Sequence, residues 1–201
     1  MRPILVIPLL LAPLPAVIAA WPGGAEPTVQ PPATQAALDA EQLDFARRPI
    51  TYFNQECGAC HGNYGSFWGE GFAAAYDDAG LRKVVDEMAV GPAQMPLEGV
   101  ALDVQVAYHR SLVDGKPFVT VFTDKGALMG EVTPGSEVVL LIDGKEQPAT
   151  VEKHAWRSNA KAATAVRVRK GGEVTEIPLG AGGKKDEPVA FSHTTAGQSP
   201  S

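Results

Sequence analysis

The sequence has few cysteines and no excess of positive charge. Only two of its 201 residues are cysteine, Cys57 and Cys60, which excludes a framework of several disulfides. Lysine and arginine number 17 against 23 aspartates and glutamates, and the formal net charge is −6. Nucleic-acid phosphates would repel such a chain, so we expect no nucleic-acid binding. The C-terminal half also lacks a nucleophile elbow and a phosphate-binding glycine loop, so it shows no recognisable catalytic constellation.

Long apolar runs are also absent after the first twenty residues. Residues 1–20 begin with a basic residue, Arg2, continue through a short apolar core and end in Ala19 and Ala20. This order predicts a secretory signal peptide that is cleaved near Ala19 or Ala20, which would place the mature protein in the periplasm. An uncleaved membrane anchor is the alternative, and only in that case do we expect the protein to be membrane-bound.

Changes in composition predict the organisation of the remaining chain. Residues 21–34 hold four prolines and are expected to form an extended tether. Residues 35–113 show helical spacing of apolar side chains, whereas β-branched runs dominate 117–180, with hairpin turns expected at 143–144 and 171–172. We therefore expect an all-α domain followed by a small antiparallel β sandwich or barrel. The glycine-rich and polar residues 181–201 predict a disordered tail.

The residues Cys57-Gly58-Ala59-Cys60-His61 form the pattern C-x-x-C-H. Two thiols at this spacing can each form a thioether to a haem vinyl group, and the adjacent histidine can bind the iron. A thioredoxin-like redox pair, half a zinc site and a disulfide are the rival interpretations. A redox pair is expected in a βαβ setting, which the pattern of elements does not suggest. A zinc site needs further ligands, and the remaining histidines are scattered along the sequence.

The second axial ligand is predicted from the methionines. Met95 precedes Pro96 in a loop that follows a predicted helix, whereas Met88 and Met129 are expected to pack within their elements. A thioether opposite a histidine favours ferrous iron and raises the potential of a haem. We therefore predict Met95 as the sixth ligand. His109 is the rival candidate.

Residues 36–113 resemble the class I c-type cytochromes. Phe53 stands four residues before Cys57, Gly62 follows His61, and Gly91 with Met95-Pro96 matches the family's G-x-x-x-M-P element. The resemblance implies an all-helical haem domain with one haem c, covalently bound through Cys57 and Cys60, with His61 and Met95 as axial ligands. One departure is that no proline lies between His61 and Pro92 to supply a carbonyl for the ring N–H of His61. The predicted fold class is therefore α+β in two parts, a cytochrome c haem domain at 35–113 and a small all-β domain at 117–180.

The predicted function is that of a periplasmic single-haem electron carrier and not of an enzyme in its own right, although it could be the electron-transfer subunit of a dehydrogenase or oxidase complex. Residues 36–113 carry eleven acidic and five basic side chains, which favours redox partners with a basic docking face. Two alternatives stay open. One is a haem enzyme or gas sensor with an open sixth position, and the other is an assembly module that acts through the β domain.

Overall fold

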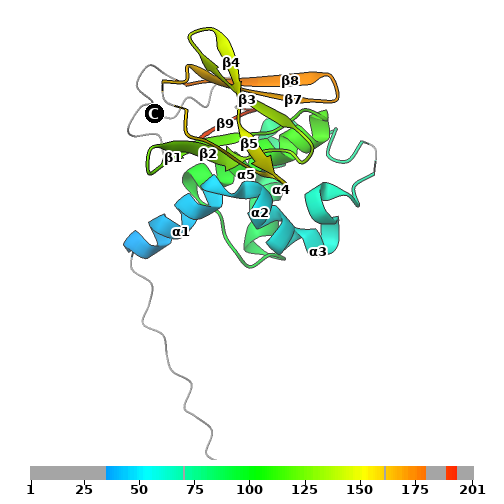
Figure 1. Cartoon of the computed structure of the whole chain (residues 1–201). Coiled ribbons are helices and arrows are strands. Elements are labelled where there is room, and N and C mark those ends of the chain that lie inside the picture. Colours follow the sequence, from blue (N-terminus) through cyan, green and yellow to red (C-terminus); the bar gives the residue numbers. More distant parts are fainter. Residues whose placement is uncertain (1–34, 70, 161, 180–188, 194–201) are drawn as a thin grey trace, which may run out of the picture. The chain divides into compact units, whose positions relative to one another are not determined.

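A computed structural model describes residues 35–69, 71–160, 162–179 and 189–193 of this chain (Figure 1). The described residues belong to one compact unit, Thr34–Ser201. The predicted signal peptide at 1–20 and tether at 21–34 lie outside the described residues. Within the described ranges, no helix is long and apolar enough to cross a membrane.

The helices lie in the first part of the chain. Their bounds are α1, Gln35–Arg47; α2, Pro49–Tyr52; η1, a π-helical turn at Phe53–Cys57; α3, Gly58–His61; η2, a 3₁₀ turn at Asn63–Gly65; α4, Asp78–Val90; and α5, Gly99–Asp114. Pro49 is the first residue of α2, where its missing N–H leaves no hydrogen bond unmade. Asp77 caps α4 by accepting a hydrogen bond from the Gly80 amide at 2.7 Å.

Helix α5 packs against both α1 and α4. The helical core is made of buried apolar side chains from α1, α2, η1, α4, α5 and the loop before α5: Ala46, Ile50, Tyr52, Phe53, Leu81, Val85, Ala89, Leu97, Ala101, Leu102, Val104, Ala107 and Tyr108. Leu81, Val85 and Ala89 repeat at intervals of four, so they line one face of α4. This periodicity explains why α4 buries one face against α5 and exposes the other.

In the described part of the chain, nine strands follow in two antiparallel sheets. They are β1, Thr120–Asp124; β2, Ala127–Glu131; β3, Glu137–Ile142; β4, Lys145–Pro148; β5, Thr150–Glu152; β6, Ala155–Ser158; β7, Ala165–Lys170; β8, Glu173–Pro178; and β9, Ala190–Phe191. One sheet has the order β5-β6-β2-β1-β9, and the other has the order β4-β3-β7-β8. The two-residue turns at 143–144 and 171–172 join β3 to β4 and β7 to β8, as the sequence predicts. All four turn residues have positive φ, as a type I′ hairpin requires.

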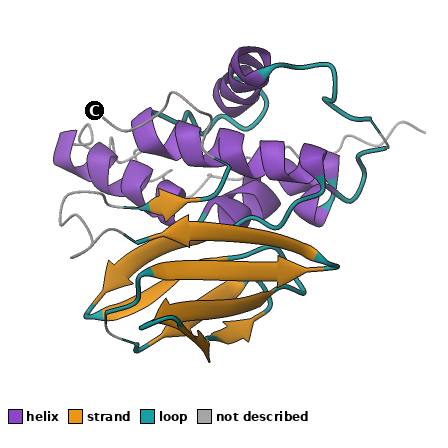
Figure 2. Ribbon diagram, turned by 90° about the horizontal axis from the view of Figure 1, so that it is seen from above, coloured by secondary structure: helices purple, strands orange, loops and turns teal. Residues whose placement is uncertain are grey.

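The five-stranded sheet lies between the helices and the second sheet (Figure 2). Side chains alternate along a strand, and the segment leading into β1 shows this clearly. Val119 and Val121 belong to the core between the sheets. Phe118 and Phe122 belong to, or pack against, the core of the helices. Alternate residues of one strand therefore belong to two cores on opposite faces of the sheet.

This shared core overturns the predicted fold class. The structure is not an all-α cytochrome c haem domain followed by a separate β sandwich or barrel. Phe118 and Val189, which lie outside the helices, are fully part of the helical core, and the described residues form one unit in which two antiparallel sheets are a major part. The sequence suggests two parts because periodicity along the chain changes near residue 115, and periodicity does not reveal that β1 packs on the helices.

The C-terminal segment also differs from the expected disordered tail where it is described. Ala190 and Phe191 form β9, which pairs antiparallel with β1 through Val121↔Ala190 and Thr120↔Phe191. The Val119 amide donates to Ser192 Oγ at 3.0 Å, and the Ser192 amide donates to the Val119 carbonyl at 3.0 Å. Ala190 and Phe191 therefore form an edge strand, which a hydrogen bond from the Ser192 amide extends. The remaining residues of 181–201 lie outside the described ranges.

Candidate functional site

The C-x-x-C-H motif lies where the helical chain that starts at Pro49 ends. The chain runs without a break through α2, η1 and α3, and His61 is its last helical residue. Gly62 stops the helix with a φ of +72°, and a Cβ at this position would lie 2.3 Å from Ser66 Oγ. The chain then turns back, so that the Phe67 amide donates to the His61 carbonyl at 2.9 Å. Glycine at 62 is thus what allows a tight loop to follow the histidine.

Both thiols of the motif are free, and their environments differ. Cys57 is half-buried and Cys60 is exposed. Burial raises the pKa of the Cys57 thiol to about 11, with smaller contributions from Glu56 and Cys60. A nucleophilic redox cysteine has a lowered pKa instead, so this environment disfavours the thioredoxin-like interpretation.

The His61 ring is held by an indole. Trp68 Nε1 donates to His61 Nδ1 at 2.7 Å, and the two ring centroids lie 5.3 Å apart. An indole nitrogen can only donate, so Nδ1 carries no proton and the neutral ring holds its proton on Nε2. The sequence leaves open which group accepts a hydrogen bond from the ring N–H of His61. In this structure the partner of Nδ1 is instead a donor, the Trp68 indole.

Aromatic side chains surround this histidine. Phe53 from η1 contacts the rings of both His61 and Trp68, and Phe72 stacks on Trp68 with centroids 4.2 Å apart. Several aromatic residues of the following loop are exposed: Phe67 at 73%, Phe72 at 39% and Tyr76 at 45%. A cavity of about 350 Å³ lies in this region, lined by loop residues such as Tyr64 and by Leu112 and Val113 of α5. The segment after the motif thus presents apolar rings next to the histidine, and the cavity lies beside two of these rings, Trp68 and Phe72.

Met95 lies in the loop between α4 and α5 and is half-buried against the helical core. Its amide donates to the Ala89 carbonyl at 3.0 Å, and its carbonyl accepts from the Tyr52 hydroxyl at 2.8 Å. Tyr52 in turn lies close enough to Cys57 for that thiol to contribute to its raised pKa, although burial is the larger cause. The Met95 loop is therefore tied to the helical segment that carries Cys57. Among the described residues, no hydrogen bond joins Met95 to His61.

His109, the rival ligand, shares two aromatic neighbours with His61. Its ring is 5.4 Å from that of Phe53 and 5.5 Å from that of Trp68, both of which also contact His61. His109 Nδ1 lies 2.8 Å from the Gln105 carbonyl, one turn earlier in α5. Loss of hydration lowers the pKa of His109 to about 4, so the ring is neutral at pH 7.

The three basic side chains of α4 and α5 have carboxylate partners. Arg82 pairs with Asp103, Arg110 pairs with Asp78 at 3.0 Å, and Lys83 lies 3.8 Å from Glu87. The first two pairs join α4 to α5 and thereby fix the helix on which His109 lies.

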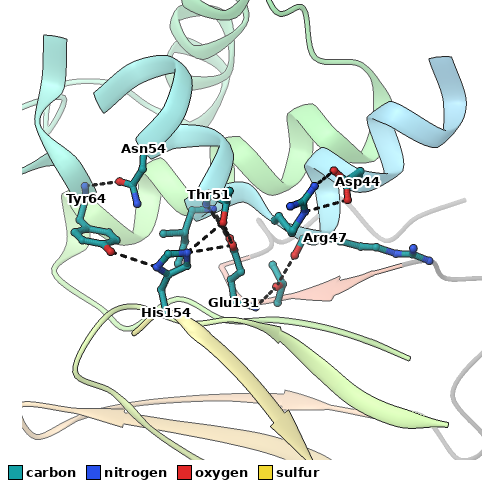
Figure 3. A network of polar contacts seen from close by, with 10 residues as sticks. Asp44, Arg47, Thr51, Asn54, Tyr64, Glu131 and His154 are labelled. Carbon is teal, nitrogen blue, oxygen red and sulfur yellow. Dashed lines mark hydrogen bonds and ion pairs between the residues drawn. The ribbon is translucent and has the colours of Figure 1, made fainter. Parts of the chain in front are cut away.

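A second group of polar residues joins the helices to the five-stranded sheet (Figure 3). Glu131, at the end of β2, accepts hydrogen bonds from the Ile50 amide at 2.6 Å, the Thr51 amide at 3.1 Å and the Thr51 hydroxyl. His154 Nε2 lies 3.1 Å from Thr51 Oγ1, and its Nδ1 lies 3.2 Å from the Tyr64 hydroxyl. We call Thr51, Tyr64, Glu131 and His154 the interlayer network.

Sequence analysis does not find this network. His154 has no partner near it in the sequence, and Glu131 looks like an ordinary strand-end carboxylate. The Glu131 side chain is only 5% exposed. It lies at the N-terminus of α2, whose free amides donate hydrogen bonds to the buried carboxylate. Only the packing of β2 on α2 brings these residues together.

The donors around the motif fit a covalently attached haem, with one adjustment. Two free thiols three residues apart, an adjacent imidazole and the exposed aromatic loop suit an apolar macrocycle. A neutral histidine that binds iron through Nε2 carries its proton on Nδ1 and donates it. That arrangement requires the Trp68 indole to move away from Nδ1.

Among the described residues, no group of three or more histidine, cysteine, aspartate or glutamate side chains is arranged to hold a metal ion. No family model, curated protein or solved structure matches this chain.

Proposed function

We propose that this protein is a single-haem c-type electron carrier, with haem c attached to Cys57 and Cys60 and with His61 as an axial ligand. The observation that carries the proposal is the intact C-x-x-C-H motif with two free thiols, followed by a loop of exposed aromatic residues. When bound, the haem would supply a one-electron ferric/ferrous couple. The protein would need no substrate other than its redox partners.

The chain's own residues would hold and position the group. Cys57, at the end of η1, and Cys60, in α3, lie on one continuous helical segment, so the separation of the two thiols is fixed before attachment. Phe53 and Phe72 contact the His61 ring and would limit access of water to it. A dry, apolar environment around a haem disfavours the extra charge of ferric iron and so raises the potential.

We assign the sixth position to Met95. The support is its tie through Tyr52 to the helical segment of Cys57, and its place in a loop that is bonded to α1 just after Met95. Gln42 of α1 donates to the Pro96 carbonyl at 2.9 Å and accepts from the Glu98 amide at 2.8 Å. These bonds fix the backbone at Pro96 and Glu98 and leave the Met95 thioether available as a ligand.

The proposed setting is the periplasm, because the pattern of residues 1–20 predicts a secretory signal. Electron donors and acceptors would dock through a basic face of their own, because residues 36–113 of this chain carry eleven acidic and five basic side chains. Association with such partners should therefore weaken as the salt concentration rises.

Expression with and without a haem-attachment system tests the proposal. Mass spectrometry of the purified, denatured protein should show one haem bound, and Cys57→Ser with Cys60→Ser should abolish it. The reduced protein should give a low-spin spectrum that carbon monoxide does not change. Rapid carbon monoxide binding would support the alternative of a haem enzyme or sensor with an open sixth position. Absence of covalent haem in the wild-type protein would refute the proposal.

A further inference from the structure

A second cavity in the described part of the chain lies away from the cysteine motif. It has a volume of about 810 Å³ and lies between the end of α1, the start of α2 and the five-stranded sheet. We call it the interlayer cavity. Pockets of a few hundred to about a thousand Å³ that combine apolar walls with a few polar groups are the usual sites for small molecules. The electron-transfer function proposed above makes no use of it.

One face of the sheet forms the floor of this cavity. The register pairs Phe122 of β1 with Met129 of β2, Met129 with Arg157 of β6, and Arg157 with Thr150 of β5. Directly paired residues project from the same face, so these four side chains form a row across four strands. All four line the cavity. The row is apolar at one end and carries a guanidinium group near the other.

The helices supply a second guanidinium group. Arg47, the last residue of α1, lines the cavity and lies over the Phe122 ring, with its guanidinium carbon 5.1 Å from the ring centroid. Its Nε atom is buried and has no hydrogen-bond acceptor among the described residues. Buried donors are nearly always paired in proteins, so an unpaired one next to a cavity points to an absent acceptor.

Neither Arg47 nor Arg157 is neutralised. The other described arginines with long-range partners, such as Arg167 and Arg169, make ion pairs with glutamates. Arg48 also lines the cavity but is paired with Asp44. By contrast, the described residues offer no ion pair or hydrogen bond to the guanidinium group of Arg47 or Arg157. An acceptor bound between them would satisfy both.

Two carboxylates of the lining oppose this positive charge only weakly. The Glu131 carboxylate accepts hydrogen bonds from the amides of Ile50 and Thr51 and from the Thr51 hydroxyl. Its negative charge is therefore compensated by α2 and is less available to a ligand in the cavity. Glu152 is exposed at the end of β5, where water screens it. The two unpaired guanidinium groups are therefore the charges available to a ligand.

From these observations we infer that the interlayer cavity binds a small organic anion, with a carboxylate or sulfonate between Arg47 and Arg157 and an apolar body against Met129. The site is independent of the proposed haem function. Arginine recognises carboxylates through two parallel hydrogen bonds, and an apolar body gains from contact with Met129.

The test uses 2-naphthoate as the anionic probe and 2-naphthamide as its neutral counterpart. Calorimetric titration of the purified protein measures affinity, and amide chemical shifts locate the site. We expect saturable binding of naphthoate, with shift changes concentrated at 129, 150 and 157. Arg157→Gln should weaken naphthoate binding about tenfold, because it removes a charge-assisted hydrogen bond. Because Arg157 is exposed, this variant should fold normally.

Lys170→Gln provides the matched control, since it removes one positive charge at the end of β7, in the other sheet. It should leave the affinity unchanged, and naphthamide should bind more weakly than naphthoate to the wild-type protein. Equal affinities of the amide and the carboxylate would overturn the proposal. So would unchanged naphthoate binding by Arg157→Gln and Arg47→Gln, shift changes confined to other surfaces, or no saturable binding at millimolar probe.

Discussion

Trp68 donates its indole N–H to Nδ1 of His61 at 2.7 Å, which fixes the tautomer of the histidine that follows the second cysteine. The proposed haem ligation needs the opposite tautomer, because iron on Nε2 leaves the ring proton on Nδ1. The two states of His61 are therefore mutually exclusive, and attachment of haem would have to exchange one for the other.

The haem-free state gives the first prediction. In the Cys57→Ser, Cys60→Ser protein, His61 should be the Nε2–H tautomer, because the indole stabilises an unprotonated Nδ1. Long-range ¹H–¹⁵N correlation spectra of the ring distinguish the two nitrogens. Adding Trp68→Phe should remove the preference, while Trp156→Phe should not, since Trp156 donates to the Thr120 carbonyl instead. An Nδ1–H tautomer with Trp68 present would contradict the geometry described above.

The second prediction concerns the sixth ligand. In the haem-loaded protein, Met95→Ala should lower the reduction potential on the order of 0.1 V, because axial ligands set haem potentials over a range of about 0.8 V. The variant should also bind carbon monoxide when reduced. Potentiometric titration measures the first effect. Met88→Ala is the matched control, since Met88 is exposed on α4 and should leave the potential unchanged. An unchanged potential in Met95→Ala, together with a lowered one in His109→Ala, would transfer the assignment to His109.

Local patterns in the sequence predict several elements of this fold and miss others for identifiable reasons. The Asp143-Gly144 and Gly171-Gly172 turns, and the neighbouring strands β3, β7 and β8, follow from residues that tolerate positive φ and from β-branched runs. Strand β2 is missed because Ala127–Glu131 contains no β-branched residue, and β4 because Lys145–Pro148 is charged and ends in proline. Their strand conformation comes from pairing with β1 and β3, which is tertiary information.

The candidate sites divide in the same way. Cys57, Cys60 and His61 are adjacent in sequence, so their spacing alone suggests their chemistry. The interlayer network and the cavity combine residues about 80 to 100 positions apart, such as Thr51 with Glu131 and with His154. No periodicity encodes those contacts, because they depend on how the sheet packs on α2.

The third prediction tests the edge strand at the C-terminal end. Val189 is 5% exposed and belongs to the helical core, so Val189→Ala should lower the free energy of unfolding by about 2 kcal/mol. Val174→Ala removes the same atoms from β8, where the side chain is 55% exposed, and should cost well under 1 kcal/mol. Denaturant titrations measure both values. Equal, small effects would mean that this segment contributes nothing to the core.

The fourth prediction concerns the pH dependence contributed by Glu131. Burial raises the pKa of this carboxyl above its ordinary value of about 4.3, despite hydrogen bonds from Thr51 and Ile50 that act in the opposite direction. Between the ordinary and the raised pKa, the folded state binds more protons than the unfolded state. The free energy of unfolding contributed by Glu131 therefore falls as pH rises through this window.

Other groups in the protein change the free energy of unfolding with pH in the opposite direction. The pH dependence of the wild-type protein alone therefore does not isolate the contribution of Glu131. Burial lowers the pKa values of His109 and His154, and stability from these residues is lost as pH falls below about 6.5. The informative quantity is the difference in unfolding free energy between Glu131→Gln and the wild-type protein at each pH.

At pH 4, Glu131→Gln should be about 1–3 kcal/mol less stable than the wild-type protein, because a glutamine cannot accept all the hydrogen bonds that the α2 amides and Thr51 donate. This deficit should shrink as pH rises, because the wild-type carboxyl loses its proton at a growing cost in desolvation. Glu173→Gln, at an exposed position in β8, should show no such trend. Urea titrations at a series of pH values give each difference. A deficit that grows with pH would mean that the helix N-terminus outweighs burial and holds Glu131 as a stabilised anion, and the direction of the pKa shift would then have to be reversed.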